Sequence, residues 1–109
     1  MKWEFRIFLS EEDGSRIFGK GPMNLLKKIR ETGSLHQAAK ELDMAYSKAL
    51  KIIKNAEVHL GKPLIIRTTG GKAGGGSVLT QEAMELIENF ENLESTIQEI
   101  IDKEPRMLM

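Results

Sequence analysis

The sequence of this 109-residue chain predicts a mainly α fold with small β-hairpins. Two short amphipathic helical patterns lie between Gly33 and Asn55, separated by a break of about three residues. A glycine-rich hairpin pattern follows them, and an uninterrupted helical pattern then runs from Thr80 to about Lys103. This order is typical of a winged helix-turn-helix, here followed by a long C-terminal helix.

The composition restricts the classes of function. Hydrophobic content of 40% and charged content of 29% are ordinary for a globular domain, and no apolar run approaches the roughly 20 residues that span a bilayer. The N-terminal residues interleave charges with apolar side chains, unlike a secretory signal, so we expect a cytoplasmic protein without a membrane partner. The sequence has no cysteine, and its two histidines, His36 and His59, lie far apart. We therefore expect no metal site, no cofactor and no enzymatic activity.

Charge is divided unevenly along the chain, although the formal net charge is zero. Residues 1–80 contain 14 of the 16 Lys and Arg residues but 8 of the 16 acidic residues, and residues 81–109 contain the others. A basic body joined to an acidic tail is typical of a nucleic-acid-binding domain with an extension that stays off the nucleic acid.

The first elements of the predicted DNA-binding domain (residues 1–80) are a hairpin over 2–18 and a helix over about 22–32. Trp3, Phe5, Ile7 and Leu9 alternate with mostly charged residues, which favours a half-buried strand. Pro22 suits the first turn of a helix, and Gly33 suits its end.

The helix-turn-helix itself is predicted as helices over 34–42 and 45–60. Ser34 can cap the first helix with its hydroxyl, and small Ala38 and Ala39 allow the second helix to approach closely. Asp43 occupies the turn, where it tolerates a left-handed backbone. A hairpin over 64–79 with a glycine-rich tip then forms the wing.

The C-terminal helix, predicted over 81–104, carries an apolar seam with alternating spacings of three and four residues. Such a seam favours dimerisation through this helix, and packing onto its own domain is the alternative. The predicted dimer contacts are Ala83, Leu86, Phe90, Leu93, Ile97 and Ile100.

The candidate DNA contacts lie on both helices and on the wing. Lysines on one face of the second helix can reach phosphates or guanine edges, and side chains at the start of the first helix can meet a phosphate. Tyr46 is either a DNA contact or a core aromatic with its hydroxyl at the surface. The full set is Ser34, Gln37, Tyr46, Ser47, Lys48, Lys51, Lys54, Arg67, Thr69 and Lys72.

The chain resembles the N-terminal DNA-binding domain of the ModE family of molybdate-responsive transcription regulators, which is related to the LysR-type DNA-binding domain. The residues that carry the resemblance include Gly19-Lys20-Gly21, Glu31-Thr32-Gly33-Ser34, Ala38-Ala39, Thr69-Gly70-Gly71-Lys72, Gly74-Gly75-Gly76 and Val78-Leu79-Thr80. The resemblance implies a homodimeric regulator that binds double-stranded DNA with the second helix in the major groove. It also implies a link to molybdate or tungstate metabolism.

We expect a stand-alone form without the family's molybdate-binding region. Regulation could then use a separate oxyanion-sensing partner, or DNA binding could be constitutive. A function of another class also stays open: a protein-protein interaction module that uses the winged helix as a scaffold and the acidic helix as a docking surface.

Overall fold

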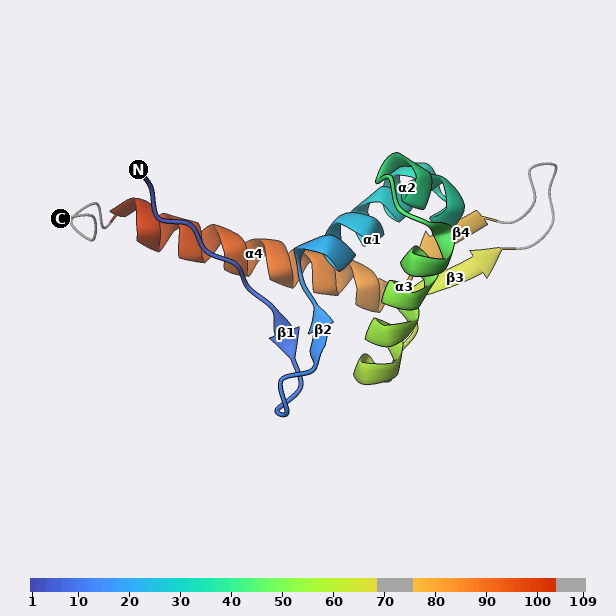
Figure 1. Cartoon of the computed structure of the whole chain (residues 1–109), viewed down its shortest axis with the longest axis horizontal. Helices are drawn as coiled ribbons and strands as arrows, with labels where there is room; N and C mark the ends of the chain where they lie inside the picture. The colour runs from blue at the N-terminus through green and yellow to red at the C-terminus, as the bar shows by residue number, and fades with distance from the viewer. Residues whose placement is uncertain (69–75, 104–109) are drawn as a thin grey trace.

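The computed structural model describes residues 1–68 and 76–103 and contains four helices and two small antiparallel sheets in that part of the chain. The elements in chain order are β1 (Leu9–Ser10), β2 (Arg16–Phe18), α1 (Lys20–Thr32), α2 (Leu35–Glu41), α3 (Tyr46–Leu60), β3 (Ile65–Thr68), β4 (Gly76–Leu79) and α4 (Gln81–Lys103). Helices α1 to α3 and the β3–β4 hairpin gather at one end, and α4 extends away from them (Figure 1). The mainly α, winged helix-turn-helix fold with a long last helix is confirmed.

Local sequence signals determine where the first three helices begin and end. Gly33 ends α1 in the left-handed region with φ 72°, and its amide donates to the Ile29 carbonyl at 2.7 Å. The Ser34 hydroxyl caps α2 by accepting from the Gln37 amide at 3.1 Å. Asp43 adopts φ 54° in the turn, and Gly61 ends α3 with φ 68°. Helix α1 begins at Lys20, two residues before the predicted start at residue 22.

The predicted first strand is wrong for residues 2–8. Strand β1 contains only Leu9 and Ser10, which pair with Phe18 and Arg16 across an irregular register. A strand needs a partner of matching length, and β2 is only three residues long. The preceding residues are extended chain that runs beside α4, with Phe5 and Ile7 half-buried.

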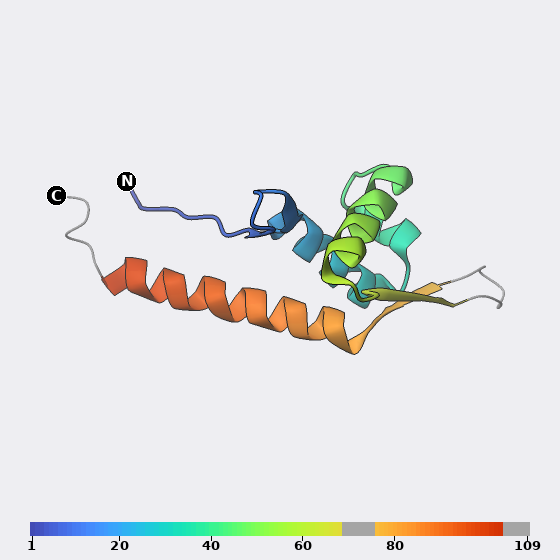
Figure 2. The ribbon, with the colours of Figure 1, turned by 90° about the horizontal axis from the view of Figure 1, so that it is seen from below.

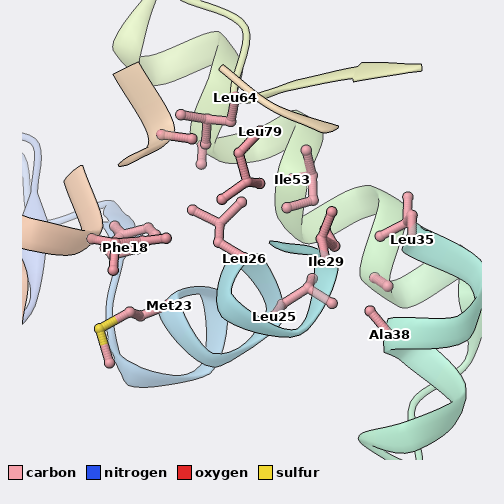
Figure 3. Packing of buried hydrophobic residues seen from close by; sticks show 14 of the residues in the cluster. Phe18, Met23, Leu25, Leu26, Ile29, Leu35, Ala38, Ile53, Leu64 and Leu79 are labelled. Carbon is pink, nitrogen blue, oxygen red and sulfur yellow. The ribbon is translucent and has the colours of Figure 1, made fainter. Parts of the chain in front are cut away.

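The hydrophobic core centres on α1, which contributes Leu25, Leu26 and Ile29, all fully buried (Figure 3). Ile53 of α3 and Leu64 before β3 pack on the same cluster. On the other side, Phe18 of β2 meets Phe90 of α4 edge to face, with ring centroids 5.6 Å apart. The core thus holds the helix-turn-helix, the wing and the first half of α4 in one unit.

The base of the wing is fixed to the end of α1. The Ser77 amide donates to the Gly33 carbonyl at 2.8 Å. A Cβ at Gly76 would lie 2.9 Å from that same carbonyl oxygen, so the backbones can approach this closely only with glycine there. Thr80 joins the wing to α4, because its hydroxyl donates to the Pro63 carbonyl at 2.8 Å and accepts from the Ala83 amide at 3.2 Å.

Helix α4 packs on its own domain in its first half and leaves it in its second half (Figure 2). Ala83 and Phe90 are buried in the domain core, so they cannot belong to an exposed dimer seam, and the prediction is corrected at these two positions. Leu86 and Ile97 are half-buried, whereas Leu93 and Ile100 are exposed. The seam that remains available is therefore narrower and lies toward the C-terminal end.

Two ion pairs hold α4 against α1. Lys27 contacts Glu91 at 2.8 Å, and Lys20 contacts Glu94 at 3.3 Å. The hydrogen bond from Lys27 lowers the pKa of the Glu91 carboxyl. No helix among the described residues is both long and apolar enough to cross a membrane.

Candidate nucleic-acid interface

One face of α3 is polar and open to solvent. The buried residues Ala49, Ile53 and Ala56 recur at three- and four-residue spacing and turn one side of α3 toward the core. The opposite side exposes the four residues predicted there to contact DNA: Ser47, Lys48, Lys51 and Lys54. Within residues 1–68 and 76–103, these lysines form no ion pair, so their ammonium groups are available to an anionic partner.

The other two helix-turn-helix candidates lie at the start of α2. Ser34 is half-buried, and its hydroxyl oxygen already caps the helix. Gln37 is exposed, and its side-chain amide donates to Glu41 at 3.2 Å. Contact with a phosphate would therefore use the hydroxyl hydrogen of Ser34, or would exchange the Gln37 hydrogen bond for a new one.

Tyr46, the first residue of α3, connects three elements. Its hydroxyl accepts a hydrogen bond from the Arg67 guanidinium of β3, and the Arg67 Cζ atom lies 5.7 Å from the Tyr46 ring centroid. On the α2 side, the His36 ring lies 4.9 Å from the Tyr46 ring, centroid to centroid. Tyr46 is half-buried, its ring packs near His36 and its hydroxyl meets an exposed arginine, as expected for a packed aromatic with its hydroxyl at the surface. Its contact with DNA stays a prediction.

This Tyr46–Arg67 clasp, as we call the contact, could not be found by sequence reasoning. The two residues are 21 positions apart. Arg67 was predicted to contact DNA, and Tyr46 was predicted either to contact DNA or to pack as a core aromatic, with no link between the two residues. The hydrogen bond brings Arg67 of β3 next to the start of α3. Thr69 and Lys72, the other two wing candidates, lie outside the described residues.

Glu57 is a positioning residue that the sequence analysis missed. Its carboxylate accepts hydrogen bonds from the Leu64 amide at 2.8 Å and from the Ile65 amide at 3.4 Å. These bonds fix the direction in which β3 leaves α3 and so aim Arg67. The sequence did contain a signal for this role: an acidic residue in the last turn of a helix interacts unfavourably with the helix dipole, which indicates that its carboxylate has another partner.

Two acidic residues of α1 and α2 are partly compensated by one lysine. Glu41 of α2 lies 3.6 Å from Lys28 of α1, which also contacts Glu31 at 3.3 Å. The hydrogen bond with Glu31 raises the pKa of Lys28, so this ammonium stays charged and neutralises its neighbours. In the part of the chain that the structure describes, no three His, Cys, Asp or Glu side chains lie close enough to hold a metal ion.

The comparisons with known proteins agree with this geometry. Residues 22–84 match the family of bacterial regulatory helix-turn-helix proteins of the lysR type. The transcriptional regulator ModE of Haemophilus influenzae is 39% identical over 74 residues, which are 68% of this chain and 29% of that protein. The DNA-binding transcriptional dual regulator ModE of Escherichia coli K12 is 36% identical over 80 residues, which are 73% of this chain and 30% of that protein.

A third relative has a different name. The molybdenum-pterin-binding protein MopB of Rhodobacter capsulatus is 33% identical over 91 residues, which are 84% of this chain and 33% of that protein. The chain thus spans about a third or less of the length of the curated relatives it matches. The resemblance to the ModE family is confirmed for the region that carries the helix-turn-helix.

Proposed function

Because the chain belongs to the lysR family of bacterial regulatory helix-turn-helix proteins, we propose that it is a homodimeric transcription regulator that binds specific sequences of double-stranded DNA. The observation that carries the proposal is the exposed α3 face with Lys48, Lys51 and Lys54, adjoined by Arg67 of the wing. A helix of this kind fits the major groove, and its lysines can neutralise phosphates or reach guanine edges.

The wing supplies the second contact region in this proposal. Arg67 lies at its start and would meet the backbone or the minor groove beside the α3 site. Thr69 and Lys72 are proposed to continue this contact. Ser34 and Gln37 would bind the phosphate nearest to the start of α2, and Ser47 would lie next to the lysines at the bases.

The homodimer is supported by the exposed seam on α4. At 100° per residue, Leu86, Leu93, Ile97 and Ile100 share one face, and no charged residue lies on this face between residues 86 and 100. Elsewhere α4 is strongly acidic. Depletion of charge around exposed apolar residues is typical of the centre of an interface. A two-fold dimer would present two recognition helices to two half-sites of the DNA.

The genes it regulates are proposed from the relatives' names. Both ModE proteins named above are called regulators, and relatives in Azotobacter vinelandii and Herbaspirillum seropedicae are called molybdenum transport protein ModE. We propose that the chain acts in the cytoplasm on genes of molybdate or tungstate metabolism, with a separate oxyanion-sensing partner. Calorimetry with molybdate and tungstate tests the last point, because saturable micromolar binding to this chain alone would contradict it.

The experiment that tests DNA binding is selection of bound sequences from a random duplex pool with the purified chain. We expect an enriched motif with two symmetric halves. Lys48→Ala and Lys51→Ala should each weaken binding to that motif by about 1 to 3 kcal/mol where a base contact is lost. Lys103→Ala removes the same charge at the far end of α4 and is the matched control. No enrichment, or equal effects of all three substitutions, would refute the proposal and favour an interaction module.

A further inference from the structure

The N-terminal segment, residues 1–8, and the second half of α4 enclose a groove of about 810 Å³. The segment runs alongside α4 toward its C-terminal end and stands off from it, as the two views together show (Figures 1 and 2). Trp3 and Phe5 line one wall, and Phe90, Gln98 and Ile101 line the other. The volume corresponds to roughly two turns of a helix 10 Å across.

The walls of this groove leave large apolar side chains in water. On the wall that the segment forms, Trp3 is 47% exposed and Phe8 is 44% exposed. Leu93 and Ile100, which are 51% and 57% exposed, lie on the neighbouring face of α4, outside the lining. An extended segment that exposes an aromatic side chain gains little by lying parallel to a helix without packing on it. A further element that fills the space between them would bury this apolar surface. The occupant must therefore offer apolar side chains to the wall that carries Trp3.

The charges of the groove indicate what kind of occupant fits. The lining has both signs of charge: the segment carries Lys2, Glu4 and Arg6, the adjoining hairpin and α1 add Arg16 and Lys20, and α4 adds Glu94 and Asp102. Lys20 already pairs with Glu94 at 3.3 Å. Arg6 forms no ion pair with any described residue, and Lys2 pairs only with Glu4 on the same exposed segment. An acidic amphipathic helix would complement Arg6 and Arg16, the two basic lining residues that form no ion pair with a described residue.

The chain itself contains such a helix. Residues 81–103, the whole of α4, have seven acidic residues and one lysine, together with the apolar seam. Two such helices alone would repel each other, since both carry a large negative charge. A basic segment placed against the partner's helix lowers this repulsion.

We propose that two copies of the chain interlock, with the second half of α4 of each copy lying in the groove between α4 and residues 1–8 of the other. The inference rests on the homodimer in the proposed function and adds the N-terminal segment to its interface. Trp3 and Phe5 of one copy cover Leu93 and Ile100 of the other, and Arg6 meets the acidic flank of that helix. In this arrangement the alternating apolar residues of 2–8 pack on the partner copy, and they do not form one face of a β-strand.

Cysteine cross-linking tests this arrangement directly, because the chain has no cysteine of its own. Trp3→Cys and Ile100→Cys are prepared as separate proteins, mixed in the absence of DNA and oxidised, so that every disulfide between the two variants joins two copies. We expect a heterodimer as the main disulfide-linked product. Ser95→Cys replaces Ile100→Cys in the matched control, since Ser95 is exposed on another face of the same helix half, and it should give at least fivefold less heterodimer.

Sedimentation of the uncross-linked protein supplies a second readout. Trp3→Glu should raise the dissociation constant of the dimer at least tenfold, whereas Val58→Glu, an equal change at an exposed residue of α3, should not. A dimer that gives no excess of the Trp3–Ile100 product over the control overturns this inference and leaves the proposed dimer in place. A chain that is monomeric at all concentrations overturns both, and duplex binding is measured independently of either result.

Discussion

Replacing Tyr46 with Phe tests whether the wing is held in position by the recognition helix. The substitution keeps the aromatic ring that packs near His36 and removes only the hydroxyl that accepts a hydrogen bond from Arg67. Tyr46 is half-buried and Arg67 is exposed, so the lost bond should lower the free energy of unfolding by no more than about 1 kcal/mol. The protein should therefore fold normally, and the effect should appear in DNA binding.

The size of that effect follows from the freedom that Arg67 gains. Without the Tyr46 hydroxyl, the long Arg67 side chain must be ordered when DNA binds, which costs about 0.5 to 1.5 kcal/mol. The affinity should then fall about 2- to 12-fold. The number of positive charges stays the same, so the slope of log K against log salt should not change. Arg67→Ala, by contrast, should make that slope shallower by about 0.9 for one lost phosphate contact.

Fluorescence anisotropy with the selected duplex, measured at several salt concentrations, gives both quantities. The single variants and the double variant complete a mutant cycle, in which we expect a coupling energy of at least about 0.5 kcal/mol because the two side chains act together. Strictly additive effects would refute the clasp, since they would mean that Tyr46 and Arg67 contact DNA independently.

Three further predictions concern the fold. Leu26→Ala truncates a fully buried residue and should lower the free energy of unfolding by about 2 to 5 kcal/mol in denaturant titrations; a loss below 1 kcal/mol would contradict the described core. Lys27→Met should flatten the loss of stability in acid: the Lys27 hydrogen bond lowers the folded-state pKa of Glu91, so the pair stabilises the fold above the usual glutamate pKa and is lost as pH falls below it. If the melting temperature falls equally between pH 7 and pH 3 in Lys27→Met and in the unsubstituted protein, the result would argue against this pair. Glu57→Gln should accelerate amide exchange at Leu64 while leaving the α1 amides protected, and equal protection in both proteins would exclude the positioning role.

The helix boundaries could be predicted because the signals for them are local. Gly33 and Gly61 end helices in the left-handed conformation, Ser34 caps the next helix, and Asp43 takes the turn conformation for which its side chain is suited. In each case the residue acts on backbone groups within four positions of itself. A single sequence contains everything that is needed to recognise such a signal.

The errors concern contacts between distant parts of the chain. Alternation in residues 2–8 fits any extended segment with one apolar side, and only the short β2 shows that no strand can form there. The spacing on α4 gives the apolar face but not what covers it, so Ala83 and Phe90 could not be assigned to the domain core. The clasp between Tyr46 and Arg67 likewise depends on how β3 leaves α3.

The salt dependence of duplex binding tests the central claim most directly, that the lysine face of α3 lies against DNA. Lys48, Lys51 and Lys54 are replaced together by Gln, and Arg30, Lys62 and Lys103, which lie outside the proposed DNA contacts and the groove lining, are replaced together by Gln in a matched control with the same net charge. If each α3 lysine neutralises one phosphate, the slope of log K against log salt should become shallower by about 2.7 in the first variant and stay nearly unchanged in the control. Equal slopes in the two triple variants would contradict the claim.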